Sequence, residues 1–212
     1  MLDKSNHLRK IIIIWLIILP TQLSFGQYGK QSQLFTDIKT VSEYIAFNLP
    51  KNSPELKQID SIYNFALKLK NNDISEALII LTFSTIPYNV LPIRIPLINM
   101  KINYPIISAE IPLFIQKNSN LPKSFLSDSP HTDFGDRDKL AHFFGSAFLS
   151  YNFVFFDLTN LIGYFVESFE ETFVEDAQFD FRDIKINQAG ETFGKTLREN
   201  KMALPSSELS KY

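Results

Sequence analysis

The sequence is organised around one stretch, Asp138-Lys139-Leu140-Ala141-His142-Phe143-Phe144-Gly145-Ser146, which precedes a long apolar run. Asp138 and His142 are four residues apart, so a helix would present both side chains on one face. Further acidic residues follow at Glu167, Glu170 and Asp183. A polar cluster beside an apolar helix is typical of a functional site. It is also typical of a structural histidine that is buried and hydrogen-bonded to its neighbours.

The C-terminal part of the chain predicts three helices in succession. Apolar residues recur with helical spacing over residues 138–156, 158–175 and 183–198. Asp157 and Asp183 are suitable N-caps for the second and third of these helices. The join between the first two is short, which predicts an antiparallel hairpin. We therefore expect residues 131–200 to form a three-helix module built on that hairpin.

The hairpin predicts which acidic residues approach His142. In such a hairpin, residues at equal distances from the turn lie side by side. On a helical wheel of residues 158–175, Glu170 lies at the edge of the apolar face and is directed towards the first helix, whereas Glu167 points further away. Asp183 and Asn187 are one turn apart at the start of the third helix and can approach from the side. The predicted catalytic or metal-binding cluster consists of Asp138, His142, Glu170 and Asp183.

Three short motifs in this region resemble a known family. They are Asp138-Lys139-x-x-His142, Gly163-x-x-x-Glu167-x-x-Glu170 and Asp183-x-x-x-Asn187-x-x-Gly190-x-x-x-Gly194. In this order, over about residues 133–198, they are similar to the pattern of YfiM-type envelope lipoproteins and the broader VanZ-like proteins. The resemblance implies a helical envelope module without an established reaction, and VanZ-like members are linked to glycopeptide-antibiotic tolerance. The chain departs from the pattern because it has no cysteine for lipidation and because its third helix is too polar to span a membrane.

The same residues also have a structural interpretation. Asp138 can be the first-turn acid that the helix dipole favours, and Asp183 can be an N-cap. The pattern Gly190-x-x-x-Gly194 gives a small-residue face that lets two helices approach closely. The residues to which we assign a structural or packing role are Lys139, Glu167, Asn187, Gly190 and Gly194.

The first 26 residues have the order of parts found in a signal peptide. Lys4, Arg9 and Lys10 precede the apolar run 11–19, and Ser24-Phe25-Gly26 follows as a small-x-small cleavage site. The apolar run is shorter than the roughly 20 residues of a membrane-spanning helix, so an uncleaved N-terminal anchor is the less favoured alternative. We expect an exported protein that begins near Gln27 and resides in the periplasm or outer envelope.

Residues 27–130 are expected to combine helices with a proline-rich extended region. The predicted helices cover about residues 31–48, 53–70 and 74–84. Five prolines interrupt pieces rich in Ile and Val between residues 86 and 116, which predicts short edge strands or extended segments. Residues 117–130 are expected to be a linker that holds the main domain boundary, and residues 201–212 a tail after the C-terminal module. The predicted fold class is therefore mainly α.

Composition excludes several classes of function. The 212 residues are 45% hydrophobic, which is enough for a packed core. The net charge is −2 and the basic residues are scattered, so nucleic acid is not an expected partner. The chain contains no cysteine, which excludes disulfides, thiolate chemistry and cysteine-ligated zinc.

Three hypotheses for function remain. The first is a non-enzymatic, exported bacterial envelope protein with a structural or binding role, whose expected partner is an envelope protein or a membrane surface. The second is a metal-assisted hydrolase or transferase acting on a lipid-linked or cell-wall substrate, with His142 and Glu170 as base or ligands and Asp138 and Asp183 orienting them. The third is a helix-pair interaction module formed by residues 31–84. The sequence names no particular metal, cofactor or small-molecule ligand.

Overall fold

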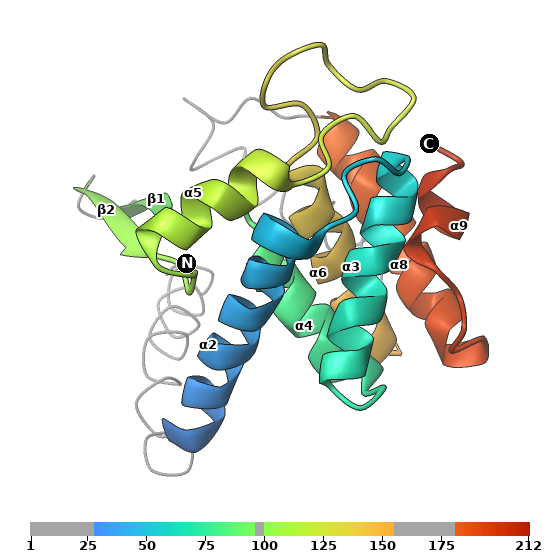
Figure 1. Ribbon diagram of the computed structural model, residues 1–212, viewed down its shortest axis with the longest axis horizontal. Coiled ribbons are helices and arrows are strands. Elements are labelled where there is room, and N and C mark those ends of the chain that lie inside the picture. The colour runs from blue at the N-terminus through green and yellow to red at the C-terminus, as the bar shows by residue number, and fades with distance from the viewer. Residues whose placement is uncertain (1–27, 96–99, 155–180) are drawn as a thin grey trace, which may run out of the picture. The chain divides into compact units, whose positions relative to one another are not determined.

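The chain is mainly helical in the computed structural model, which describes residues 28–95, 100–154 and 181–212 (Figure 1). The chain divides into two units, residues 1–36 and residues 37–212. The predicted signal peptide, residues 1–26, lies outside the described residues. None of the helices described is both long enough and apolar enough to cross a membrane.

The first helices of the described part of the chain follow the apolar spacing of the sequence. They are α2 (Tyr28–Glu43), which continues into the π-helical turn η2 (Tyr44–Asn48), then α3 (Glu55–Leu69) and α4 (Ile74–Thr85). The turn between α3 and α4 contains Asn71 and Asn72, whose φ angles of 52° and 66° are left-handed. Asparagine adopts this conformation more readily than most residues do. Asp73 then caps α4, since its Oδ1 accepts a hydrogen bond from the Glu76 N–H at 3.0 Å.

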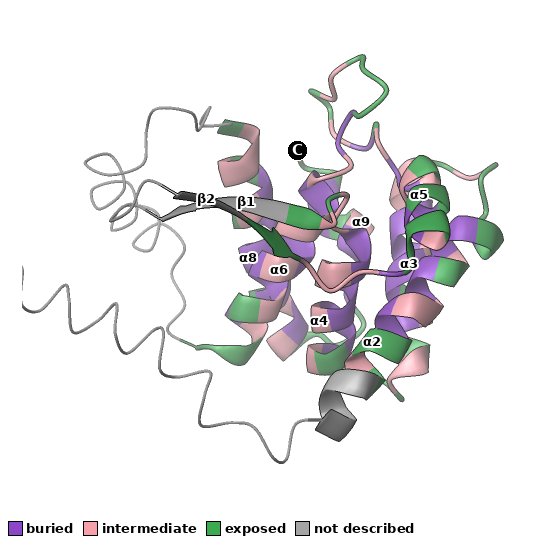
Figure 2. Ribbon diagram, turned by 90° about the vertical axis from the view of Figure 1, so that its left-hand side faces the viewer, coloured by how far each residue is buried: buried purple, intermediate pink, exposed green. Residues whose placement is uncertain are grey.

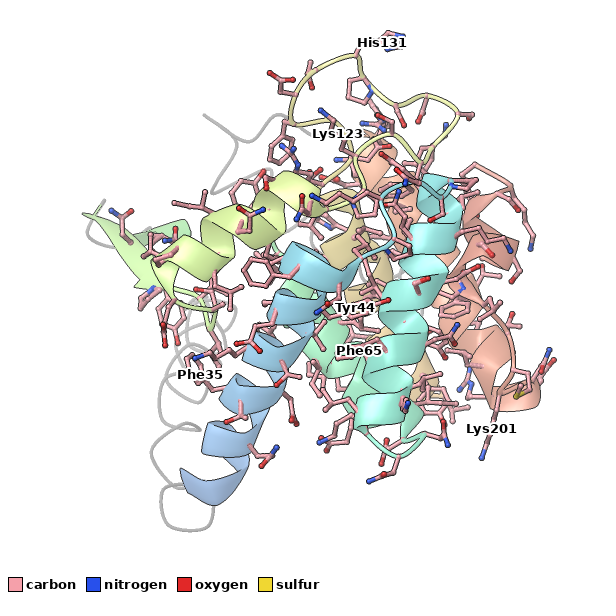
Figure 3. The ribbon with its side chains drawn as sticks, viewed as in Figure 1. Phe35, Tyr44, Phe65, Lys123, His131 and Lys201 are labelled. Carbon is pink, nitrogen blue, oxygen red and sulfur yellow. The ribbon has the colours of Figure 1, made fainter. Side chains whose placement is uncertain are left out.

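The end of α2 and the turn η2 are joined to α3 by one stacked pair of rings and one ion pair. Tyr44 and Phe65 lie with ring centroids 4.1 Å apart and planes 8° from parallel (Figure 3). Lys70 Nζ lies 2.9 Å from Asp37 Oδ2, and both side chains are largely buried. Burial strengthens such a pair, because water and salt screen it less than they screen a surface pair.

Two short strands follow α4. They are β1 (Val90–Ile95) and β2 (Met100–Pro105), which pair antiparallel with Val90 opposite Pro105 and Ile93 opposite Ile102. They lie within the proline-rich segment for which the sequence predicts short strands or extended pieces. A proline at the end of a strand removes no interior ladder bond, so Pro105 is compatible with this position.

The next element is a helix, α5 (Ile111–Asn120), where the proline pattern predicts extended chain and the start of a linker. Pro112 is compatible with a helix because it stands in the first turn, where the backbone N–H has no helical acceptor. Phe114 and Lys117 are three residues apart, lie on one face and are buried. The prediction of extended chain is therefore wrong for residues 111–116, and the prediction of a linker is wrong for residues 117–120.

The core around α6 is aromatic. α6 (Lys139–Asn152) packs against both α4 and α8 (Phe181–Glu199), and Figure 2 shows buried residues along all three helices. Phe143 and Phe193 stack with centroids 5.2 Å apart, and Tyr63 of α3 meets Phe193 edge-on at 5.6 Å. Each buried side chain of this size stabilises the fold by about 1.5–3 kcal/mol. The helix predicted over 158–175, and with it the antiparallel hairpin, lies outside the described residues.

Two glycines allow α8 to lie very close to α6. A Cβ atom on Gly190 would stand 2.2 Å from the carbonyl oxygen of Phe143, and one on Gly194 would stand 2.4 Å from that of Ala147. Both carbonyl oxygens belong to the backbone, which cannot turn aside as a flexible side chain can, and at Gly194 the Ser150 hydroxyl also stands in the way. Gly190 and Gly194 therefore set the distance between the two helices.

Residues 201–212, expected from the sequence to be a tail, contain a further helix, α9 (Pro205–Leu209), which packs on α3. Asp60 of α3 accepts hydrogen bonds from the Ser206 N–H at 2.9 Å and from Ser206 Oγ at 2.6 Å. Leu209 is fully buried. Helices on either side of residues 117–130 thus contact one another, as α3 contacts α9 and α4 contacts α6.

Candidate functional site

The first turns of α6 and α8 bring together Asp138, Lys139, His142 and Asp183, which we call the Asp138 cluster. Asp138 is the N-cap residue of α6, and Asp183 lies in the first turn of α8. The helices are held in contact by the glycine packing described above, so residues far apart in sequence meet at their N-terminal ends. Glu170, the fourth residue of the predicted cluster, lies outside the described residues, as does Glu167.

Lys139 lies at the centre of the cluster. Its Nζ donates hydrogen bonds to Asp138 Oδ2 at 3.0 Å and to Asp183 Oδ1 at 2.5 Å. The side chain is only 3% exposed. Burying an ammonium group costs free energy unless the charge is paired. The two carboxylates offset this cost for Lys139.

His142 lies at the solvent side of the cluster. Its Nε2 is 3.7 Å from Asp183 Oδ1, and its side chain is 40% exposed. This separation is too long for a hydrogen bond, but it is short enough for an ion pair when the imidazole is protonated. His142 is therefore accessible to protons and to ligands from solution, in contrast to Lys139.

Three side chains of the cluster have the donor types that divalent transition metals accept. One ligand atom each from Asp138, His142 and Asp183 lies within 4.8 Å of the other two. Asp138 Oδ1 is buried and has no hydrogen-bond partner among the described residues. A histidine with two carboxylates is a donor set that suits zinc and related ions. The Lys139 ammonium already occupies the space between the two carboxylates, which opposes binding of a second cation there.

An aromatic pair lies next to the cluster. The rings of Tyr88 and Phe134 are 6.0 Å apart, and both side chains are partly exposed. Burial raises the pKa of Tyr88 above its usual value, and the nearby carboxylate of Asp138 raises it further. The phenol therefore stays neutral and can donate a hydrogen bond beside the cluster. Sequence reasoning missed Tyr88, because it comes from the segment after α4 and no spacing links it to His142.

Asn187 lies one turn further along α8 and does not join the cluster. Its Oδ1 accepts a hydrogen bond from Ser146 Oγ at 3.0 Å, which gives a second polar link between α6 and α8. Further along, Ser150 Oγ donates to the Glu191 carbonyl oxygen at 2.8 Å. These bonds run along the same contact as Gly190 and serve packing.

A second ionic group on α8 was also missed by sequence reasoning. Arg182 forms an ion pair with Asp136, whose side chain is fully buried, and Arg182 Nε lies 3.3 Å from Asp128 Oδ1. Asp136 Oδ2 also accepts from the backbone N–H of Leu126 at 3.2 Å. This network holds the segment before α6 against the start of α8. The only sequence signal for it was the density of charge around residues 133–139.

Comparison of the chain with protein-family models, with curated proteins and with solved structures finds no significant match.

Proposed function

We propose that the chain is a non-enzymatic, exported protein of the bacterial cell envelope, in which the Asp138 cluster holds α6 against α8 within a rigid binding module. The observation that carries the structural role is the buried Lys139 ammonium, which donates to both Asp138 and Asp183. A divalent cation on the same carboxylates would lie within a few ångströms of this ammonium. Repulsion between two such charges is on the order of several kcal/mol near a protein surface.

The proposal predicts that the cluster is complete without a metal. The melting temperature of the purified protein should be the same before and after treatment with a chelator. Calorimetric titration with zinc should give no saturable binding that depends on the cluster. A melting temperature that falls on chelation and returns with zinc would contradict the structural role.

The proposed export rests on the order of basic, apolar and small residues in 1–26. Intact-mass measurement of the protein from the envelope fraction of its native cells tests this part. A mass that corresponds to a chain beginning near Gln27 is expected. A mass that includes residues 1–26 would indicate an N-terminal anchor instead, and recovery from the cytoplasm alone would contradict export.

The second candidate function is a metal-assisted hydrolase or transferase acting on a lipid-linked or cell-wall substrate. The specific observation in its favour is that Asp138, His142 and Asp183 each offer a ligand atom within one small volume, and that His142 is 40% exposed. In this alternative His142 is base or ligand, and the two carboxylates bind or orient the metal.

Two histidine variants distinguish the two candidate functions. His142→Ala should abolish zinc binding if the cluster is a metal site, whereas His131→Ala should not, because His131 is exposed on the loop before α6 (Figure 3). Stoichiometric zinc binding by the wild type and the His131→Ala protein, lost in the His142→Ala protein, would establish the second candidate. Equal behaviour of all three proteins agrees with the structural proposal.

A further inference from the structure

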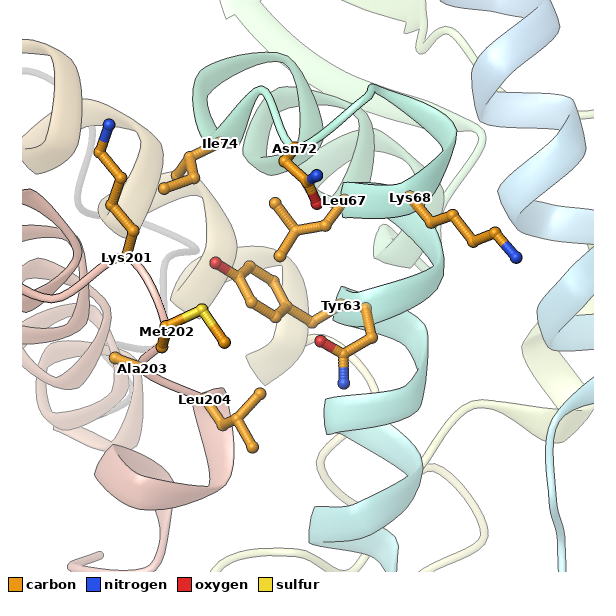
Figure 4. Close-up of a pocket in the computed structure, with 10 residues that line it drawn as sticks. Tyr63, Leu67, Lys68, Asn72, Ile74, Lys201, Met202, Ala203 and Leu204 are labelled. Carbon is orange, nitrogen blue, oxygen red and sulfur yellow. The ribbon is translucent and has the colours of Figure 1, made fainter.

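A cavity of about 610 Å³ lies between α3 and the loop that joins α8 to α9, away from the Asp138 cluster (Figure 4). Small-molecule sites commonly have volumes of about 300–1,000 Å³ and mostly apolar walls. The walls here include Leu67 of α3, Ile74 at the start of α4 and Leu204 of the α8–α9 loop. The cavity is therefore of the size and character of a ligand site.

The wall formed by the α8–α9 loop is held at both of its ends. On one side the Asp60 carboxylate accepts from the Ser206 N–H at 2.9 Å and from Ser206 Oγ at 2.6 Å. On the other side Asn200 Oδ1 accepts from the Met202 N–H at 3.1 Å. These bonds fix the loop backbone, so the cavity is formed before any ligand arrives and binding does not have to order the chain.

One polar group is buried in the wall without a partner. The Tyr63 side chain is 1% exposed, and its hydroxyl makes no hydrogen bond with any described residue. Figure 4 shows the hydroxyl pointing into the space among Leu67, Ile74 and Met202. Burial raises the pKa of Tyr63, so the hydroxyl is protonated at neutral pH and is available as a donor. An unpaired buried donor is unfavourable, and an acceptor oxygen from a ligand would remove that cost.

The opening of the cavity carries a basic residue, Lys201, and a flexible side chain, that of Met202. Lys201 is exposed and has no ion pair among the described residues. Met202 also lines the cavity and is 85% exposed, so its unbranched side chain can change position when a ligand enters. Lys68 is also at the edge, and Figure 4 shows the ammonium groups of both lysines directed away from the Tyr63 hydroxyl. Lys201 stands on the same loop as Met202, so rotation of its flexible side chain brings its ammonium to the opening, whereas Lys68 extends from the other side of α3.

We propose that this cavity binds a small amphipathic carboxylate. One carboxylate oxygen accepts a hydrogen bond from Tyr63, the Lys201 side chain turns its ammonium towards the other oxygen, and the apolar body lies against Leu67 and Leu204. The ligand class follows from one buried neutral donor, one unpaired cation at the opening and apolar walls between them. The inference does not depend on the role of the Asp138 cluster.

Isothermal titration calorimetry with two probes of equal chain length, decanoate and decanol, tests the proposal on the purified chain. Decanoate should bind about tenfold more tightly than decanol, because a hydrogen bond to a charged acceptor is stronger and Lys201 adds attraction. Tyr63→Phe should weaken decanoate binding about tenfold, and its melting temperature should not fall, since the hydroxyl has no protein partner. Lys201→Gln should weaken decanoate binding several-fold and leave decanol unchanged.

The matched control is Lys68→Gln, which makes the same change of charge at the edge of the cavity and should leave decanoate binding unchanged. Met202→Trp is a second variant that does not touch the core, and it should block entry of both probes. Failure of decanoate and of 4-phenylbutyrate to bind at millimolar concentration would overturn the proposal. Equal affinity for decanoate and decanol, or unchanged decanoate binding in Tyr63→Phe or in Met202→Trp, would overturn it as well.

Discussion

Lys139 Nζ lies 2.5 Å from Asp183 Oδ1, an ion pair that joins the first turns of α6 and α8 across 44 residues of sequence. The same ammonium also holds Asp138, so one buried cation orders two carboxylates. Because the cation belongs to the chain, the contact between the helices needs no ligand from solution.

Replacing Lys139 with Met should lower the free energy of unfolding by about 3 kcal/mol, the low end of the range for breaking a buried pair, since Asp183 is partly exposed. The methionine fits the space but leaves Asp138 and Asp183 facing each other without a cation. Urea denaturation measures the loss. The control is Lys185→Met, which removes an exposed pair with Asp128 and should cost less than about 1 kcal/mol. Equal losses in the two variants would mean that burial of Lys139 contributes nothing.

Gly190→Ala should destabilise the protein by about 3 kcal/mol or more, because the new methyl group would stand 2.2 Å from the Phe143 carbonyl oxygen and the helices would have to separate. Thermal unfolding followed by circular dichroism is the measurement. Gly145→Ala on α6 is the matched control, since among the described residues its methyl group would meet the Thr82 side chain, with the nearest atom, Cγ2, at 3.4 Å. That change should be nearly neutral or stabilising by up to about 1 kcal/mol, because alanine favours the helix. A stable Gly190→Ala protein would contradict the close contact of α6 and α8.

Lys117 should make the stability of the protein depend on pH. Burial without a carboxylate partner lowers the pKa of Lys117 to about 7, and its Nζ donates to the Ile86 carbonyl oxygen at 2.8 Å. Between pH 7 and the ordinary lysine pKa of about 10.4, the unfolded chain holds a proton here that the folded protein has released. This group therefore makes the free energy of unfolding rise with pH in that window, by up to about 1.4 kcal/mol per pH unit.

Urea denaturation at several pH values between 7 and 10 tests the Lys117 prediction. Lys117→Met should remove this contribution to the slope and should stabilise the protein most at the lower end of the range. Lys51→Met, at an exposed position, should keep the wild-type slope. Parallel pH profiles of the wild type and Lys117→Met would show that Lys117 keeps its ordinary pKa.

Local sequence predicted the elements whose signals are local. The apolar spacing of α3 and α4, the N-cap Asp73 and the apolar stretch of α6 can each be read within one or two helical turns. Proline misled the prediction for α5, because Pro112 breaks a helix only outside its first turn, and the sequence alone does not say where that turn begins.

The sequence by itself determined the mainly helical class, the proximity of Asp138 and His142 on one face, and the small residues that would permit close helix packing. The tertiary structure decided that Lys139, rather than His142, lies at the centre of the cluster. It also decided that Asp60 accepts hydrogen bonds from the first turn of α9 and that Tyr63 lies in the wall of a cavity. The reason is physical: burial and long-range pairing depend on which surfaces meet. A lysine in the first turn of a helix has the same local sequence whether it faces water or a carboxylate 44 residues away.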